Sequence, residues 1–419
     1  MQKANAEMAG RQRIGHGECF ERRPQVKRAL VSVLATATLG GMSMGQTNVP
    51  PSSASVPPAK TWADKITLKG DLRYRYESIN DDSKHDAAGE TYTRQRDRLR
   101  ARLRAEAKCN ENLKAGVEVS TGQGDPISGN QTLGDGFAKK DFRLSLAYLD
   151  YSLLGDSPHE LHGIAGKMKN PFLTMPDDLV WDPDLSPEGV AAQGRWIRGI
   201  ATLLANGGYM WIQERSDRDD LMLYAGQGAL KLEFAPEVAL TLGVSYYGFQ
   251  NMQGYDVVDW ESKNNAYGNS TANGTVSGTT TNKAWACEFT PVVYFAQLDL
   301  WVAGKPLAVY AQELSNSDAT SLDQGHLYGV SLGKAKNPRT WELGYNYAEL
   351  EKDATVGMFT DSDRWGGGTD GKGHKVYGKY QLMKNLQAAV SYFFDEKKIS
   401  DPAKKTDYDR LQVDLVANF

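Results

Sequence analysis

The sequence predicts an all-β protein, a transmembrane antiparallel up-and-down β-barrel of about 16 strands. Two observations predict this fold. Apolar and polar side chains alternate with a period of two from residue 66 to the C-terminus, and the connections between the alternating segments are short and long in turn. In bacterial barrels, lipid-facing residues alternate with lumen-facing ones, and short periplasmic turns alternate with long external loops.

The first alternating segment has a densely charged polar face. Leu68 and Leu72 alternate with Lys69, Asp71 and Arg73. In a soluble sandwich the apolar face would point inward, whereas in a membrane barrel it faces lipid and the charged face lines a wet lumen. The same pattern predicts strands over residues 66–79, 92–108, 112–121, 140–154, 161–169, 194–205, 208–216, 221–234, 237–250, 283–302, 306–315, 324–334, 340–352, 372–383, 385–396 and 406–419.

The connections between these strands alternate in length. Long external loops are expected at 80–91, 122–139, 170–193, 251–282, 316–323, 353–371 and 397–405, and the turns between them are short, such as Asn206–Gly207. Only the connection at Asp217–Asp220 is too short for its place in the series. An even number of strands with both termini on the periplasmic side fits this rhythm.

The N-terminal region predicts export from the cytoplasm. Lys27 and Arg28 precede an apolar stretch, 29–45, that is too short to span a bilayer as a helix. A basic segment, a short apolar core and small residues beyond it are typical of a signal peptide. We therefore expect residues 1–25 to be a mis-called upstream extension, 26–45 a signal peptide, 46–65 a Pro/Ser-rich periplasmic linker and 66–419 the barrel.

Composition and motifs exclude several classes of protein. The mean hydropathy of −0.52 is too polar for a bundle of membrane helices. Seven of the 48 basic and three of the 52 acidic residues lie in 1–45, which leaves 41 basic and 49 acidic side chains and excludes a basic nucleic-acid-binding surface. The stretch 366–373 resembles a phosphate-binding loop, but Gly373 stands where a hydroxyl should bind magnesium. No histidine pair has metal-ligand spacing, so no metal, cofactor or catalytic group is expected.

The last strand ends in an aromatic residue. Phe419 is the final outward-facing residue of the alternating segment 406–419. A terminal aromatic on such a strand resembles the signal that the outer-membrane assembly machinery reads. We therefore expect Phe419 to act as an assembly signal.

The second predicted strand carries a ladder of arginines on one face. Alternate residues of a strand lie about 6.6–6.8 Å apart and point to the same side. On the lipid face each arginine at mid-depth would cost about 2–4 kcal/mol. We therefore expect a basic, lumen-lining wall formed with neighbours on the first strand: Arg73, Arg75, Arg94, Arg96, Arg98, Arg100, Arg102 and Arg104.

Three segments carry a family resemblance. The stretches 166–172 (GKMKNPF) and 180–190 (VWDPDLSPEGV), and Asp361-Ser362-Asp363 followed by 366–373, resemble the putative-porin family of Gram-negative outer membranes. The resemblance covers about residues 62–419 and implies a 16-stranded, general-porin-like channel in the cell outer membrane. Its implied partners are outer-membrane lipid and lipopolysaccharide, the barrel-assembly machinery, small hydrophilic solutes and two further copies in a homotrimer.

The resemblance also implies that the third external loop folds into the barrel and narrows it. In this chain that loop is 170–193, and Lys167 and Lys169 at its base would help to position it. An acidic loop facing a basic wall would create a transverse field across the constriction. The expected constriction-loop acids are Asp177, Asp178, Asp182, Asp184 and Glu188.

We expect a non-enzymatic porin that admits small hydrophilic solutes and ions by passive diffusion. Three alternatives remain open at this point. The arginines could be ordinary salt-bridged lumen lining, or they could serve an anion- or phosphate-selective pore. In another class, the chain could be an outer-membrane barrel enzyme or a surface structural protein.

Overall fold

The computed structural model describes residues 62–419, apart from 156, 259, 261–264 and 277–278. The expected upstream extension, the signal peptide 26–45 and the linker up to residue 61 lie outside the described residues. A short 3-10 helix, η1 (Trp62–Lys65), leads into the first strand.

Sixteen long antiparallel strands form one closed barrel, with the two-residue β4 (Gln131–Thr132) as a minor addition. The all-β barrel prediction is therefore confirmed. The wall strands are β1 (Ile66–His85), β2 (Thr91–Lys108), β3 (Leu113–Thr121), β5 (Phe142–Ser152), β6 (Glu160–Lys167), β7 (Glu188–Arg198), β8 (Ala201–Gln213), β9 (Leu221–Ala235), β10 (Val238–Gln250), β13 (Pro291–Val302), β14 (Lys305–Asn316), β15 (Gln324–Gly333), β16 (Trp341–Leu350), β17 (Gly371–Met383), β18 (Leu386–Lys397) and β19 (Thr406–Asn418).

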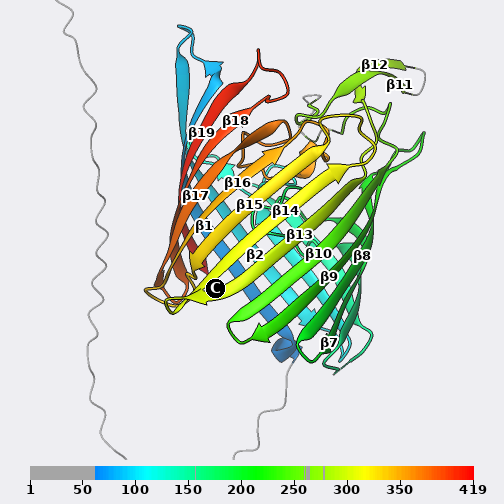
Figure 1. Ribbon diagram of the computed structural model, residues 1–419, viewed down its shortest axis with the longest axis vertical. Coiled ribbons are helices and arrows are strands. Elements are labelled where there is room, and N and C mark those ends of the chain that lie inside the picture. The colour runs from blue at the N-terminus through cyan, green and yellow to red at the C-terminus, as the bar shows by residue number, and fades with distance from the viewer. Residues whose placement is uncertain (1–61, 156, 259, 261–264, 277–278) are drawn as a thin grey trace, which may run out of the picture. The chain divides into compact units, whose positions relative to one another are not determined.

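The barrel closes between its first and last strands. β1 pairs with β2 on one side and with β19 on the other, in a register that runs from Asp71↔Asn418 to Asp81↔Tyr408. The tilted strands surround a lumen, with the long connections gathered at one end (Figure 1). Because every wall strand has two neighbours, no backbone edge is left facing lipid.

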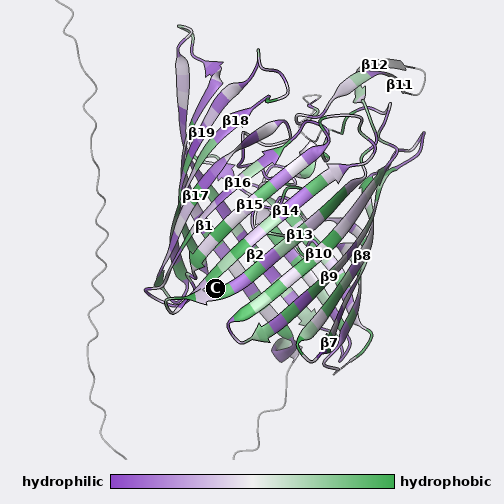
Figure 2. Ribbon diagram, viewed as in Figure 1, coloured by the Kyte–Doolittle hydropathy of each residue, from purple (hydrophilic) through white to green (hydrophobic). Residues whose placement is uncertain are grey.

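The strands alternate between a lipid face and a lumen face, as the sequence predicts. Large apolar side chains such as Leu72, Val309 and Val390 are exposed, whereas Asp71 and Gln312 on the same strands are buried. Figure 2 shows hydrophobic and hydrophilic residues alternating along the ribbons. No helix in the described ranges has the length and apolar character needed to cross a membrane.

Two predicted boundaries are wrong around β7 and β8. The sequence predicts a short turn at Asn206–Gly207, between strands over 194–205 and 208–216. The chain instead turns at Gly199 with φ of 59°, and Asn206 and Gly207 lie within β8 opposite Gln193 and Ala192. Asn206 is held there because its amide donates to Gln227 Oε1 at 2.9 Å. The predicted start of this strand at residue 194 is also wrong, because β7 begins at Glu188.

The predicted strand 283–302 is also wrong, because it merges two elements. Residues Thr279–Trp285 form β12, which pairs with β11 (Thr271–Val276) in a separate hairpin of the long loop. The wall strand β13 begins only at Pro291. Proline lacks a backbone N–H and is tolerated at the first position of a strand, which explains where the barrel pairing starts.

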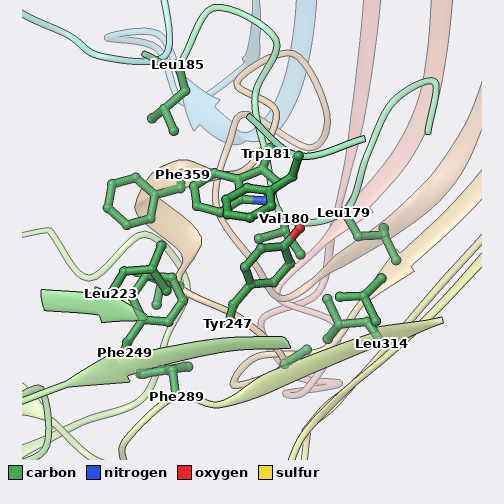
Figure 3. Packing of buried hydrophobic residues seen from close by; sticks show 14 of the residues in the cluster. Leu179, Val180, Trp181, Leu185, Leu223, Tyr247, Phe249, Phe289, Leu314 and Phe359 are labelled. Carbon is green, nitrogen blue, oxygen red and sulfur yellow. The ribbon is translucent and has the colours of Figure 1, made fainter. Parts of the chain in front are cut away.

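An apolar cluster packs against the inward face of the wall. Trp181, from the connection between β6 and β7, packs against Tyr247 on β10 and against Phe359, with distances of 5.2 Å and 6.1 Å between the ring centroids. Phe359 lies in the connection between β16 and β17 and stacks on Phe249. Figure 3 shows these rings together with Leu223 and Leu314 from the wall strands. Part of the lumen near the external end is therefore filled by packed loops.

Candidate pore constriction

The connection between β6 and β7, residues 168–187, is here called loop L3. Its first half is hydrogen bonded to the neighbouring wall. Gln193 Nε2 on β7 donates to the carbonyl of Pro171 at 2.6 Å. Gln227 on β9 is bound twice by Leu173: its Oε1 accepts the Leu173 N–H at 2.7 Å, and its Nε2 donates to the Leu173 carbonyl at 2.8 Å.

The middle of L3 reaches wall strands far from its own. The Leu179 N–H donates to Gln312 Oε1 on β14 at 2.9 Å. Asp177 accepts from Asn346 on β16 at 2.5 Å and from Lys375 Nζ on β17 at 2.6 Å. These partners belong to the polar, inward-facing set of their strands, so the middle of L3 lies against the lumen face of β14, β16 and β17.

The second half of L3 returns to the arginine ladder. Asp184 accepts from Arg100 Nη1 at 2.8 Å and from Arg102 Nη1 at 3.3 Å. Both arginines also bind Asp71 on β1, at 3.1 Å and 2.6 Å. L3 is therefore tied to β7, β9, β14, β16, β17 and β2, strands spread widely around the barrel.

The remaining ladder arginines have different partners. Arg96 Nε donates to Glu77 at 2.6 Å, Arg104 Nε donates to Glu118 at 2.8 Å, and Arg98 donates to the backbone carbonyl of Asn130 at 3.1 Å. Arg94, near the external end of β2, is exposed. Most members of the ladder are thus held in ion pairs or hydrogen bonds.

The two predicted arginines of β1 bind two other connections. Arg75 makes a bidentate pair with Asp414 at 2.6 and 2.8 Å and donates to Asp363 at 3.0 Å. Arg73 Nη2 donates to Asn130 Oδ1 at 2.7 Å. Asp363 belongs to the connection 351–370 (loop L7) and Asn130 to the connection 122–141 (loop L2), so the basic wall anchors L2, L3 and L7 alike.

A deeply buried ion cluster of the lumen joins Glu77 to Arg410, a residue that the sequence pattern did not single out. Glu77 is 0% exposed and accepts from Arg96 and, at 2.6 Å, from Arg410 on β19. Arg410 also pairs with Asp363 at 2.8 Å. The period-two pattern places Glu77 and Arg410 on lumen faces, but only the closing contact between β1 and β19 brings them together.

The predicted loop acids divide into two groups by environment. Burial would raise the pKa of Asp177 and of Asp184, but Lys375 beside Asp177 and Arg100 beside Asp184 hold both pKa values below the ordinary range. Burial raises the pKa of Asp178, whose carboxylate accepts N–H groups within L3, at 2.9 Å from Val180. Asp177 and Asp184 of L3 therefore pair with cations of the wall, whereas Asp178 stabilises the conformation of L3 by accepting hydrogen bonds from its backbone.

Asp182 joins L3 to L7. Its carboxylate accepts the Ser362 N–H at 3.0 Å and the Asp184 N–H at 2.7 Å. Burial, followed by the charges of Asp361 and Asp184, raises the pKa of Asp182 well above its ordinary value. Burial and the neighbouring Asp363 also raise the pKa of Asp361, to about 6.

The comparisons with known proteins agree with this architecture. The family model described as "Putative porin" matches residues 80–281 and 299–419, more than half of the chain. The chain belongs to this porin family. Family and fold place the porin in the outer membrane.

Several solved structures are similar to this porin. OprB of Pseudomonas putida, in a high-pH structure, is similar with a TM-score of 0.54 and 10% identity, over 85% of this chain and 95% of that one. OmpF of Salmonella typhi, in complex with daunomycin, gives 0.49 and 12% identity over 84% and 97%. OmpT of Vibrio cholerae, in a loop L8 deletion mutant, gives 0.48 and 12% over 84% and 99%. Of these three structures only that of OprB has a TM-score above 0.5, and it supports the barrel fold. No curated protein matches the sequence significantly.

The residues at the base of L3 in the porin lie at strand ends. Glu188 is the first residue of β7, where it pairs with Lys167 of β6, and not a residue of the loop as predicted. Lys167, the last residue of β6, donates to Glu188 at 2.8 Å and to the Ser186 carbonyl at 3.1 Å. Lys169 lies just beyond β6 and is exposed. Phe419 closes the sheet through backbone hydrogen bonds with Gly70 at 2.8 and 3.0 Å.

A cavity of about 850 Å³ lies between L3 and the wall formed by β1, β2, β3 and β5. Its lining includes both L3 acids and wall cations, among them Arg102, Arg143, Lys169, Asp182 and Asp184. The cavity is the space that the packed loops leave beside the ladder, and charged groups of L3 and of the wall line it.

A second cavity of about 400 Å³ lies on the other side of the base of L3. It is lined by His162, whose Nδ1 is 2.6 Å from Asp150, and by Arg195, which pairs with Glu160. A histidine–carboxylate pair becomes a hydrolytic site when a hydroxyl nucleophile binds the ring. Within residues 62–419, apart from the gaps, no hydroxyl is hydrogen bonded to His162.

Proposed function

We propose that this porin admits small hydrophilic solutes and ions by passive diffusion, through a lumen that L3 narrows. The observation that carries the proposal is the path of L3, which starts at β6 and is hydrogen bonded to β9, β14, β17 and β2. A barrel of 16 strands is wide enough for an aqueous channel, and a loop tied across it restricts the passage.

We propose in addition that the constriction has a transverse field. Asp177 and Asp184 of L3 are ionised carboxylates, and the ladder arginines Arg100 and Arg102 face Asp184 from the wall. Fixed charges of opposite sign in a narrow, low-dielectric passage orient dipolar solutes and disfavour apolar ones. This supports selection by polarity and size rather than binding of one chemical species.

The proposal also includes the partners and the route of the protein. We propose export by the segment 26–45, assembly by the barrel machinery through Phe419, contact with outer-membrane lipid and lipopolysaccharide, and assembly into a homotrimer. The porin family and fold indicate a non-enzymatic channel, and we propose no cofactor, metal or nucleic-acid partner.

Planar-bilayer recording tests the proposal directly. Purified, folded protein should give stepwise increases in conductance, and proteoliposomes should swell in isotonic solutions of small sugars at rates that fall with sugar size. A variant that lacks residues 174–183 should conduct more per step, because the segment that crosses the lumen is gone. Folded, heat-modifiable barrel that inserts without conductance or swelling would refute the channel function.

A further inference from the structure

The charged side chains that line the large cavity beside L3 differ in whether they have hydrogen-bond partners. Its acidic residues all accept hydrogen bonds from described residues. Asp71 and Asp184 share Arg100 and Arg102, while Glu118 pairs with Arg104. The other acids are held in the same way, by a cation or by backbone and side-chain donors: Asp125, Asp177, Asp178, Asp182 and Glu188.

Two cations of the same cavity have no such partner. Among the described residues, neither Arg143 nor Lys169 makes an ion pair or a side-chain hydrogen bond, and both are exposed to the cavity. Neither residue belongs to the arginine ladder of β2. They are therefore positive groups whose hydrogen-bond donors are available to a solute.

The sheet register places Arg143 at the height of the constriction. Asp71, Arg102, Ser120 and Arg143 stand directly opposite one another on β1, β2, β3 and β5. Directly opposed residues point to the same face of a sheet, so Arg143 shares the lumen face with Arg102. Arg102 donates hydrogen bonds to Asp71 and Asp184. The guanidinium of Arg143 in the same row has no described partner, so its N–H groups can bind a solute.

Lys169 has a positive neighbourhood. It follows β6 directly and enters L3 beside the row that contains Lys69 and Arg104. Burial, followed by the charge of Arg104, lowers the pKa of Lys169, although Glu106 and Glu118 oppose this effect. Arg104 and Lys69 are themselves paired with Glu118 and Glu106, and within the described part of the chain no carboxylate forms an ion pair with the Lys169 ammonium.

From this geometry we infer that Arg143 and Lys169 form a transient binding site for a small oxyanion, a carboxylate or a phosphate, within the cavity beside L3. A guanidinium fork binds two oxygens of such a group, and an ammonium adds a point charge with three donors. The inference rests on the proposed channel function and deepens it. Oxyanions would be concentrated at the constriction and pass it faster than cations of the same size.

The test is the reversal potential of single barrels in planar bilayers at pH 7. Tenfold gradients of potassium acetate, potassium phosphate and potassium chloride are compared for the unaltered protein and for Arg143→Gln combined with Lys169→Gln. We expect the double change to lower the permeability of the oxyanion relative to potassium by about three- to tenfold, because two unit charges leave the passage. The acetate and phosphate arms show which oxyanion the site prefers.

Two matched changes remove positive charge away from the cavity. Lys139→Gln in L2 and Arg198→Gln at the periplasmic end of β7 neutralise exposed cations, and they should leave the permeability ratio unchanged. Arg143→Lys should keep most of the selectivity. A double variant that conducts with the selectivity of the unaltered protein would overturn the inference and leave the channel function intact.

A second measurement needs no variant. If the site binds an oxyanion, the conductance of the unaltered barrel should approach a plateau as potassium acetate or phosphate is raised, while potassium chloride gives a more nearly linear increase. A linear rise in all three salts would contradict the site. Absence of conductance in every salt would instead refute the proposed function, and the inference with it.

Discussion

At the scale of single residues, the basic wall works first as an anchor for loops. Arg100 and Arg102 hold Asp184 of L3, while Arg75 and Arg410 hold Asp363 of L7. Ionised pairs of this kind are strong when they are multiply hydrogen bonded and poorly solvated. The same charges that would orient a solute therefore also fix the position of the segments that narrow the lumen.

Replacing the Asp184 carboxylate should weaken the attachment of L3 to the arginine ladder. Asp184→Asn removes the charge that Arg100 and Arg102 share, and we expect a loss of about 1–2 kcal/mol in the free energy of unfolding, because Asp71 still binds both arginines. Single-channel conductance steps should become larger and noisier.

Urea unfolding in detergent measures the loss of stability, and bilayer recording measures the change in conductance. Asp401→Asn, on an exposed pair with Lys404, is the control and should change neither; an unchanged step size in Asp184→Asn would contradict the anchoring role.

The carboxyls between L3 and L7 should make the channel sensitive to pH. The pKa of Asp361 is raised to about 6, above its value in the unfolded chain, so the packed L3–L7 contact holds the Asp361 proton more tightly than the unfolded chain does. The stability that the protonated Asp361 gives to this contact is therefore greatest at low pH and is lost as pH rises from about 4 to 6. We expect L3 and L7 to pack more tightly, and closures to be longer, at pH 4.5 than at pH 7.

Asp361→Asn isolates this effect. The variant should show longer closures at pH 7 and a weaker pH dependence than the unaltered protein, because its side chain is neutral throughout and Asp182 is left as a carboxyl of this contact whose pKa is raised. Asp177 and Asp184, whose pKa values are lowered, titrate below this window and should not contribute to it. If the closure times of Asp361→Asn kept the full pH dependence, another group would have to be responsible.

At the scale of elements, glycines let aromatic rings lie flat on neighbouring strands. The ring of Tyr310 on β14 covers Gly329 on β15, where an added Cβ would lie 2.1 Å from Cζ. Gly70 on β1 accommodates Phe419 in the same way, with 2.5 Å to Cε2. Glycine weakens a strand by itself, so its presence within β1 and β15 is explained by the close approach of another group.

The packing of Tyr310 gives a test of strand pairing. Gly329→Ala should lower the free energy of unfolding by about 1–3 kcal/mol, because the ring must leave its position. Urea unfolding followed by tryptophan fluorescence measures the change. Gly226→Ala on β9 has no atom within 4 Å of the added Cβ and should be nearly neutral. Equal effects at both positions would show that backbone freedom, not the ring, decides the cost.

At the scale of the whole molecule, closure depends on the end of the chain. β19 completes the barrel by pairing with β1, and the backbone of Phe419 exchanges two hydrogen bonds with Gly70. The Phe419 side chain remains 67% exposed, on the lipid side of the sheet. Its ring is thus accessible in the closed barrel, which suits a residue that we expect the assembly machinery to contact.

Changing the last residue should impair assembly more than stability. Phe419→Ser should reduce the amount of heat-modifiable barrel recovered from outer membranes several-fold, because the expected assembly signal is lost. Phe234→Ser, at another exposed aromatic near the end of β9, is the control and should be recovered normally. Equal recovery of the two variants would refute an assembly role for Phe419.

Much of the fold follows from the sequence alone, because the environment of each wall residue is set by its own strand. A strand between lipid and water must alternate, so the period of two predicts the wall strands and the lumen faces of Arg100, Arg102 and Glu77. The family resemblance adds the porin fold. Periodicity fails where a local signal is overridden, as at Asn206–Gly207, whose Asn206 side chain binds Gln227 within β8.

The interior arrangement was decided only by the tertiary structure. No local pattern predicts that Asp177 meets Lys375, that Asp363 lies between Arg75 and Arg410, or that Arg143 has no ion-pair partner among the described residues. These contacts join residues distant in the chain through loops that lack regular periodicity. The sequence by itself determined which residues face the lumen; closure of the barrel and the packing of L2, L3 and L7 determined which of those charges neutralise one another.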